Sequence, residues 1–181
     1  MKNKVILLFA TVLTVCFSLT TQAQDSKVLA GAGLKYATDI STMGIEAKGV
    51  YLASDTWEIA PAFTYYLKKN NLNWSTLDFD AHYVFSSDDK STFYAIGGLN
   101  VTFWKFKMDG ADSLGEEYGE YADLIGGFAS DLDASGSDVG VNIGVGSRFA
   151  ISDKMYFNAD LKYTIGNANY LSAGIGLLYH F

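Results

Sequence analysis

The sequence GIGLLYHF, residues 174–181, changes its side-chain character at almost every step. Ile175, Leu177, Tyr179 and Phe181 are large and apolar, and the positions between them hold glycine, leucine or histidine. Side chains of a β-strand point alternately to opposite faces, so this period of two predicts a strand with one wholly apolar face. A chain end in water is usually frayed and polar. The apolar end of this chain instead predicts a strand that lies in an apolar environment.

Seven further stretches alternate in the same way, which makes eight predicted strands. They cover residues 28–37, 45–53, 57–67, 77–85, 93–103, 139–149, 157–165 and 171–181. The short connections SDT, SSDDKS and SDK alternate with TDISTMG, KKNNLN, residues 105–138 and GNAN. No apolar run after residue 23 reaches the roughly 18 residues that a membrane-spanning helix needs. The pattern favours an even-numbered antiparallel barrel.

The first residues have the layout of a secretory signal peptide rather than of a folded element. Lys2 and Lys4 precede an apolar run at 5–17, and the segment closes with small residues at Ala23. We therefore expect residues 1–23 to be removed and residues 24–181 to form one domain. The alternative is a lipoprotein acylated at Cys16, but the bulky Val15 stands where a signal peptidase prefers a small residue.

Charge narrows the classes of partner. The full chain has 13 basic and 20 acidic residues, and removal of the two signal-peptide lysines leaves 11 basic residues. Such an acidic chain lacks the basic surface that nucleic-acid binding requires, so no nucleic acid is expected as a partner. If the signal peptide is removed, the single cysteine is lost with it, and no disulfide or thiol chemistry is predicted.

The two faces of the strands decide what surrounds the barrel. The predicted inward residues, which form a lumen charge network, are Lys35, Glu46, Lys48, Glu58, Asp78, Asp80, His82, Arg148, Asp160 and Lys162. The predicted outward aromatic girdle comprises Tyr36, Tyr51, Trp57, Tyr65, Tyr83, Phe85, Phe93, Phe103, Phe149, Phe157, Tyr163, Tyr179 and Phe181. Rings this large would overpack the narrow interior of an eight-stranded barrel. Two aromatic girdles around an aliphatic band are typical of a barrel in lipid.

The sequence therefore predicts an all-β fold, an eight-stranded antiparallel transmembrane β-barrel with short periplasmic turns and one long extracellular loop. It predicts localisation in the bacterial outer membrane, where outer-membrane lipid and lipopolysaccharide are partners. A soluble, secreted, lipocalin-like barrel that binds an apolar ligand is an alternative interpretation. Pro61 lies in the third predicted strand and cannot donate to a ladder hydrogen bond, so a local bulge is expected there.

The stretches FYAIGGLNVTF, residues 93–103, and VGVNIGVGSRFAISDKMYFNADLKYTIG, residues 139–166, carry a family resemblance. They are similar to strand-turn-strand units of the small eight-stranded outer-membrane barrels, the family of OmpX and the OmpA transmembrane domain. The aromatic Phe181 after alternating apolar positions resembles the C-terminal signal by which the assembly machinery recognises such barrels. The resemblance covers the whole mature chain. We expect a monomer.

Function is predicted less sharply than location. The lumen candidates include four basic and five acidic residues besides His82, and mutual pairing of these charges predicts a filled interior. The segment 105–138 holds nine acidic and two basic residues. Ser113 and Glu116 in it have the spacing of a helical capping box. A structural or adhesive role through this acidic loop, toward an extracellular partner, is the favoured hypothesis; a small pore for ions or solutes is the alternative.

Catalysis and metal binding receive little support. Lipid enzymes built on such barrels need a histidine close to a serine or an acid where lipid can reach it. His82 and His180 are the only histidines, and both are predicted to point inward. The stretch DLDASGSD, residues 131–138, resembles the start of a calcium loop, but Asn142 occupies the position of the bidentate glutamate. No enzymatic activity, cofactor or metal is expected.

Overall fold

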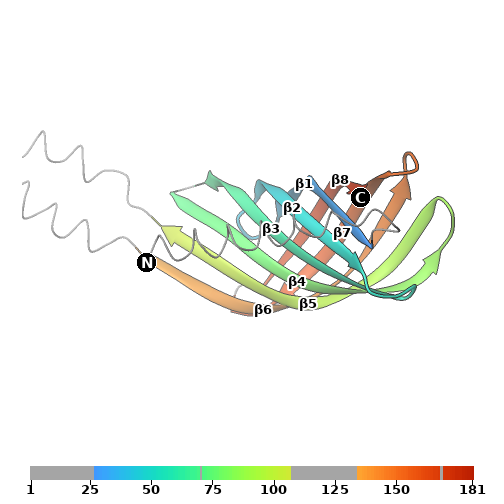
Figure 1. Cartoon of the computed structure of the whole chain (residues 1–181). Helices are drawn as coiled ribbons and strands as arrows, with labels where there is room; N and C mark the ends of the chain where they lie inside the picture. The colour runs from blue at the N-terminus through green and yellow to red at the C-terminus, as the bar shows by residue number, and fades with distance from the viewer. Residues whose placement is uncertain (1–26, 70, 107–133, 168) are drawn as a thin grey trace, which may run out of the picture.

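The computed structural model describes residues 27–69, 71–106, 134–167 and 169–181. These residues form eight antiparallel strands in a single closed barrel, in which each strand pairs with its sequence neighbours (Figure 1). The strands are β1 (Val28–Ala37), β2 (Thr42–Leu52), β3 (Trp57–Lys69), β4 (Leu72–Ser87), β5 (Ser91–Phe106), β6 (Ala134–Ala150), β7 (Met155–Ile165) and β8 (Tyr170–His180). The predicted fold class is confirmed.

The last strand closes the barrel against the first. β1 and β8 pair from Leu29 with His180 to Ala37 with Ser172, and the Phe181 nitrogen donates to the Val28 carbonyl oxygen at 3.3 Å. Because the barrel is closed, neither terminal strand has an open edge. A barrel in lipid requires this closure, since unpaired backbone groups in lipid are energetically costly. The alternating segment at the chain end is therefore one side of the closing seam.

Glycines allow the two strands of this seam to approach closely. A Cβ atom on Gly31 would lie 1.8 Å from the Leu177 carbonyl oxygen, and one on Gly33 would lie 2.3 Å from that of Ile175. Both distances are far shorter than any van der Waals contact. Inward-facing residues with side chains therefore cannot occupy these two positions unless the backbone of β8 moves.

β4, β5 and β6 exceed their predicted lengths the most, with 16, 16 and 17 residues. β5 and β6 extend together at one end of the barrel, where β7 pairs with β6 only from Val141 onward (Figure 1). The expected loop 105–138 is accordingly too wide, because residues 105–106 pair with 134–135 and residues 136–138 continue the same β5–β6 ladder. Small and polar residues such as Ser135 and Gly136 look like a loop in sequence, but ladder hydrogen bonds hold them in a strand. The remainder, residues 107–133, including Ser113 and Glu116, lies outside the described residues.

The other three connections on that side are short. Residues 38–41 join β1 to β2, residues 70–71 join β3 to β4, and residues 166–169 join β7 to β8. The connections TDISTMG and KKNNLN were expected to be loops, but residues 42–44 of the first belong to β2, and residues 68–69 and 72–73 of the second belong to β3 and β4. Asn71 adopts a φ of 63°, a conformation that asparagine tolerates better than most residues, and this allows a tight turn there.

The expected bulge at Pro61 is wrong. Pro61 pairs in register with Phe79, and the β2–β3 register is the same on both sides of it, with Lys48 opposite Ala62 and Tyr51 opposite Ile59. The proline is on the outer face, opposite a glycine on β2. Register shifts occur elsewhere, between Tyr66 and Lys69 and between Val84 and Ser86.

The apolar face of the barrel is the outer one. Tyr65 is 48%, Leu99 55% and Leu177 46% exposed, whereas Asp80 is 3% and Lys162 4% exposed. A lipocalin-like binder needs the reverse arrangement, with apolar side chains lining the interior, so that alternative is wrong. None of the described residues forms a helix of the length and hydropathy needed to cross a bilayer.

Small apolar clusters lie toward both ends of the polar interior. Near the short turns, Leu29, Val50, Ala60 and Leu178 pack together, and Val84, Tyr94 and Ile96 form a second group. At the other end the cluster is Ala37, Tyr66, Trp74 and Tyr170, which we call the outer aromatic seal. The Trp74 ring meets that of Tyr170 edge-on at 5.4 Å and lies 6.2 Å from that of Tyr66. Asp78 and Lys162 therefore lie between two apolar layers, whereas Glu58 and Arg148 line an opening near the short turns.

Candidate functional site

The ten inward residues of the predicted lumen network are all buried, and each takes part in a hydrogen bond or ion pair. Their exposed fractions are 8% or lower. Ionic and polar contacts divide them into three groups. These are the central cluster of Lys35, Glu46, Asp78, Asp80 and Lys162, the middle pair of Lys48 and Asp160, and the lower triad of Glu58, His82 and Arg148. The middle pair and the lower triad are linked through Tyr94, which bonds to Asp160 and stacks on His82.

The central cluster is held by two lysines among three carboxylates. Lys162 Nζ lies 2.8 Å from Oδ2 of Asp78 and 2.7 Å from Oδ2 of Asp80. Lys35 forms an ion pair with Glu46, and its Nζ also lies 3.3 Å from Asp78. The cluster has one more carboxylate than ammonium group. Neutral hydrogen-bond donors must therefore supply the remaining partners, because burying a charge without partners costs free energy.

Asparagine side chains supply those donors. Asn142 Nδ2 donates to Oδ1 of Asp78 at 2.9 Å and to Oδ1 of Asp80 at 2.8 Å. Asn100 Nδ2 donates to the same Asp78 oxygen at 2.6 Å. The hydroxyl groups of Thr102 and Thr164 in turn donate to the amide oxygens of Asn100 and Asn142, both at 2.8 Å. A continuous hydrogen-bonded network therefore crosses the barrel.

The middle pair connects opposite walls. Lys48 on β2 forms an ion pair with Asp160 on β7. The Tyr94 hydroxyl lies 2.7 Å from Oδ1 of Asp160 and 2.8 Å from Oδ1 of Asn158, whose own amide donates to Asp160 at 3.0 Å. Asp160 thus has three partners from three strands, and the arrangement leaves it fixed in position.

The lower triad is centred on Glu58. Arg148 NH2 lies 2.6 Å from Oε1 and NH1 lies 3.2 Å from Oε2, so the guanidinium group holds the carboxylate with both arms. His82 Nδ1 lies 3.1 Å from Oε2, and the imidazole ring stacks on Tyr94 at 4.2 Å with an interplanar angle of 12°. Both carboxylate oxygens are therefore engaged from two directions.

Several members of this network were absent from the sequence-based set. Tyr94, Asn100, Asn142 and Asn158 complete the shells of the charged residues, and all four are at most 4% exposed. Each lies an even number of positions along its strand from another inward polar residue, as Asn158 does from Asp160. The same period of two that selected the charged residues could have selected them, had neutral polar side chains been counted.

The predicted girdle residues lie on the outer face, and those near the short turns form ring pairs. Trp57 and Tyr83 have ring centroids 5.2 Å apart, Phe93 and Phe149 5.8 Å, and Tyr179 and Phe181 5.2 Å. Tyr36, Tyr51, Phe85, Phe103 and Tyr163, like Tyr65, are between 40% and 59% exposed, whereas Phe157 is only partly exposed. These rings form two bands, one near each end of the barrel.

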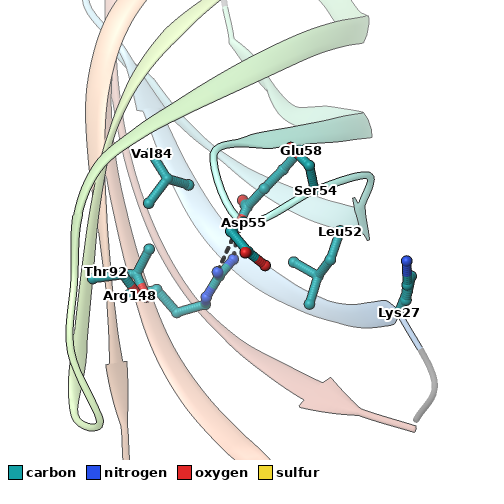
Figure 2. A pocket seen from close by; sticks show the side chains of 9 residues that line it. Lys27, Leu52, Ser54, Asp55, Glu58, Val84, Thr92 and Arg148 are labelled. Atoms are coloured by element: carbon teal, nitrogen blue, oxygen red, sulfur yellow. Dashed lines mark hydrogen bonds and ion pairs between the residues drawn. The ribbon is translucent and has the colours of Figure 1, made fainter.

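An open cavity of 440 Å³, which we call the vestibule, lies at the end with the short turns (Figure 2). Its lining comes from Lys27, Leu52, Ser54, Asp55, Glu58, Val84, Ser87, Thr92 and Arg148. In Figure 2 the Arg148 side chain reaches toward Glu58, and Lys27 lies at the opposite edge of the view. The vestibule thus gives access from one end of the barrel to the Glu58–Arg148 pair.

The positions of the histidines bear on catalysis. His82 is fully buried in the lumen, so lipid at the outer face of the barrel cannot contact it. His180 is the last residue of β8, and its ring lies 6.4 Å from that of Tyr156. Among the residues that the structure describes, no three histidine, cysteine, aspartate or glutamate side chains are grouped to hold a metal ion. The geometry therefore supports packing and hydrogen bonding for His82.

Comparison with known proteins gives a consistent result. The model of a protein family described as the outer membrane protein beta-barrel domain matches residues 9–181. The N-terminal β-barrel domain of Pseudomonas aeruginosa OprF is similar in structure with a TM-score of 0.65 at 16% identity, and the match covers 87% of this chain and 100% of that one. No curated protein matches the chain.

Two further solved structures have the same fold. Ail, the attachment invasion locus protein of Yersinia pestis, aligns with a TM-score of 0.57 at 15% identity, covering 85% of this chain and 96% of its own. Neisserial surface protein A aligns with a TM-score of 0.59 at 14% identity over the same shares. At such identities the likeness is one of fold.

Proposed function

The chain belongs to the outer membrane protein beta-barrel family, and from this premise we propose that its barrel is a closed anchor for an external interaction segment. The protein is an integral barrel of the bacterial outer membrane, and lipid surrounds its apolar face. The proposal concerns what this barrel is for. Two features support it: a lumen filled by paired side chains, and strands that extend beyond the barrel toward the acidic segment 107–133.

The filled lumen argues against transport. Eight strands enclose an interior only wide enough for side chains. Here the central cluster, the middle pair and the lower triad occupy successive parts of it, with apolar clusters at both ends. Passage of an ion would require breaking several buried ion pairs together. The interior is better suited to making the barrel rigid than to conducting.

The extended strands point to function at the outer end. β5 and β6 pair up to Phe106 and Ala134, whereas β7 pairs with β6 only from Val141 onward. Trp104 stiffens this ribbon: its indole nitrogen donates to Asp138 at 3.1 Å, and a Cβ on Gly136 would lie 2.8 Å from its ring. A rigid ribbon that carries the most acidic segment of the chain is a reasonable support for binding.

Relatives of this fold give limited but compatible support. Ail is described as an attachment and invasion protein, and it has also been solved with a heparin analogue, sucrose octasulfate. An acidic segment would repel such a sulfated ligand, so a partner with basic groups fits this chain better. We therefore propose adhesion to a basic surface through residues 107–133. No catalytic activity is proposed.

Deletion of residues 109–131, with a short Gly-Ser linker in their place, tests the adhesive role. We expect cells that display this variant to lose attachment to cultured epithelial cells and to polylysine-coated glass, while heat-resistant folding of the barrel is kept. A matched variant replaces only the acidic residues of this segment with their amides. Unchanged attachment by both variants, at equal surface amounts, would contradict the proposal.

Planar-bilayer recording tests the closed barrel separately. The refolded mature protein is expected to give no steady conductance, because no continuous water column fits beside the paired side chains. Stable open channels of reproducible size would show that the interior conducts, and the pore alternative would then replace the anchor.

A further inference from the structure

We propose that the vestibule binds a small zwitterion, an amino acid or short peptide that carries both a free ammonium and a free carboxylate group. The inference is independent of the adhesive role, since it concerns the opposite end of the barrel. It depends on one feature: a cavity whose floor has a satisfied charge pair and whose rim carries one exposed side chain of each sign that has no ion-pair partner among the described residues.

The floor is polar but adds no net charge. Arg148 and Glu58 are 6% and 3% exposed and face each other at 2.6 and 3.2 Å. His82 occupies the remaining side of the carboxylate at 3.1 Å. A guanidinium group has five N–H donors, and only two are used in this pair. The remaining donors can meet an acceptor that enters the cavity.

The rim supplies the two recognition charges. Lys27 and Asp55 both line the vestibule and are exposed. Within the described part of the chain, neither side chain makes an ion pair or a hydrogen bond. An ammonium group of a ligand would be attracted to Asp55, and its carboxylate to Lys27 and to the free donors of Arg148. A ligand with only one charge would leave one of these rim groups without a partner.

The size and location of the cavity fit this class of ligand. Its 440 Å³ is within the range of about 300–1,000 Å³ found for small-molecule sites. Leu52 and Val84 offer apolar contact for a short side chain. In outer-membrane barrels the short turns face the periplasm, so the ligand would arrive from that compartment. Because the rim charges are exposed, we expect weak affinity, on the order of 1 mM.

The test uses three dipeptides that differ only in charge. Alanylalanine, its N-acetylated form and its C-terminal amide are titrated against the refolded mature protein in micelles, with backbone amide shifts followed by NMR. We expect saturable shifts at the short-turn end of β2, β3 and β6, and about fivefold weaker binding of each capped form. Equal binding of all three forms, or no saturable shift with alanylalanine, would overturn the proposal.

Rim variants assign the two contacts. Lys27→Ala should abolish the preference for alanylalanine over its amide, and Asp55→Asn should abolish the preference over the N-acetylated form. Asp89→Asn and Lys90→Ala are matched controls, because they change the same charges at the same end of the barrel outside the vestibule. Controls that weaken binding as much as the rim variants would show general electrostatic attraction and refute a built site. Because residues 107–133 are unchanged in every variant, failure here leaves the adhesive proposal unaffected.

Discussion

Lys162 Nζ lies 2.7 Å from Oδ2 of Asp80 inside the barrel, where the two residues are 4% and 3% exposed. The same ammonium group also lies 2.8 Å from Oδ2 of Asp78, so a single lysine on β7 forms ion pairs with two carboxylates of β4. Asp78 and Asp80 lie two positions apart on β4, so both side chains point inward, whereas Phe79 between them points outward. The pair therefore joins walls of the barrel that are not neighbours in the sheet.

Lys162→Met should be strongly destabilising. The substitution leaves Lys35 as the only lysine of the central cluster, facing the three buried carboxylates of Glu46, Asp78 and Asp80. Breaking a buried pair by removing one partner costs about 3–5 kcal/mol, and we expect a loss of this size in the free energy of unfolding. Urea unfolding of the barrel in lipid vesicles measures it. The double variant Lys162→Met with Asp80→Asn should recover part of the loss, and strictly additive costs would contradict the coupling.

Leu99→Arg tests the outward orientation of the apolar face. Leu99 lies near the middle of β5 and is 55% exposed, so an arginine there would be in hydrocarbon. The expected cost is about 2–4 kcal/mol of unfolding free energy in vesicles. Ser86→Arg, near the short-turn end of β4, is the matched control and should cost about 0–1 kcal/mol. Equal costs would mean that depth in the membrane does not distinguish the two sites.

The faces of the strands could be predicted from sequence because a period of two leaves no freedom. Once Asp78 and Asp80 point inward, Leu77 and Phe79 must point outward. The strand ends could not be predicted, since Ser135 and Gly136 have loop-like character and only pairing with β5 makes them a strand. The register kept at Pro61 likewise depends on its outward position opposite a glycine.

The partners within the lumen were beyond sequence reasoning for a geometric reason. Lys48 pairs with Asp160 and Glu58 with Arg148, yet each pair comes from strands that are not adjacent in the sheet. Which inward residues reach the same height is determined by the stagger of the strands around the barrel. Alternation fixes the face of a residue but leaves that stagger open. The sequence could therefore give the members of the charge network without their pairing.

Gly33→Val should impair closure of the barrel. The added Cβ would lie 2.3 Å from the Ile175 carbonyl oxygen and 2.9 Å from the Gly176 Cα, both backbone atoms of β8. We expect a reduced yield of folded protein and a lower unfolding midpoint, measured by the heat-dependent shift in electrophoretic mobility. Gly97→Val is the control, because a Cβ there meets nothing within 4 Å. If both variants fold equally well, the close approach of β1 and β8 does not limit closure.

Asp88 makes the β4–β5 turn sensitive to acid. The Lys90 backbone nitrogen donates to Asp88 Oδ1 at 2.8 Å, and the Ser91 hydroxyl and backbone nitrogen add two further bonds at 2.8 Å. These bonds favour the carboxylate and lower the pKa of Asp88 below its ordinary value. Because the folded pKa is the lower one, the contribution to stability is present above the ordinary pKa of about 3.9 and is lost as pH falls through the folded value.

An NMR titration of the Lys90 and Ser91 amides therefore should show one transition below pH of about 3.9, and both resonances should move together. Asp88→Asn should remove this transition while the neighbouring Asp89 still titrates. A transition that persists in the variant would assign the acid sensitivity to another group.

Removing the outer aromatic seal should not open the barrel. Trp74 and Tyr170 are 5% and 3% exposed, and truncation of both to alanine should cost several kcal/mol, since loss of a large buried ring costs about 3–5 kcal/mol. The central cluster lies beneath this seal, and Asp78 bonds to Lys162 and Asn142 across the lumen without using either ring, so these bonds should persist in the variant. We therefore expect no steady current in planar bilayers from the double variant. Steady channels in it, with none in the native protein, would show that the aromatic rings rather than the ion pairs close the interior.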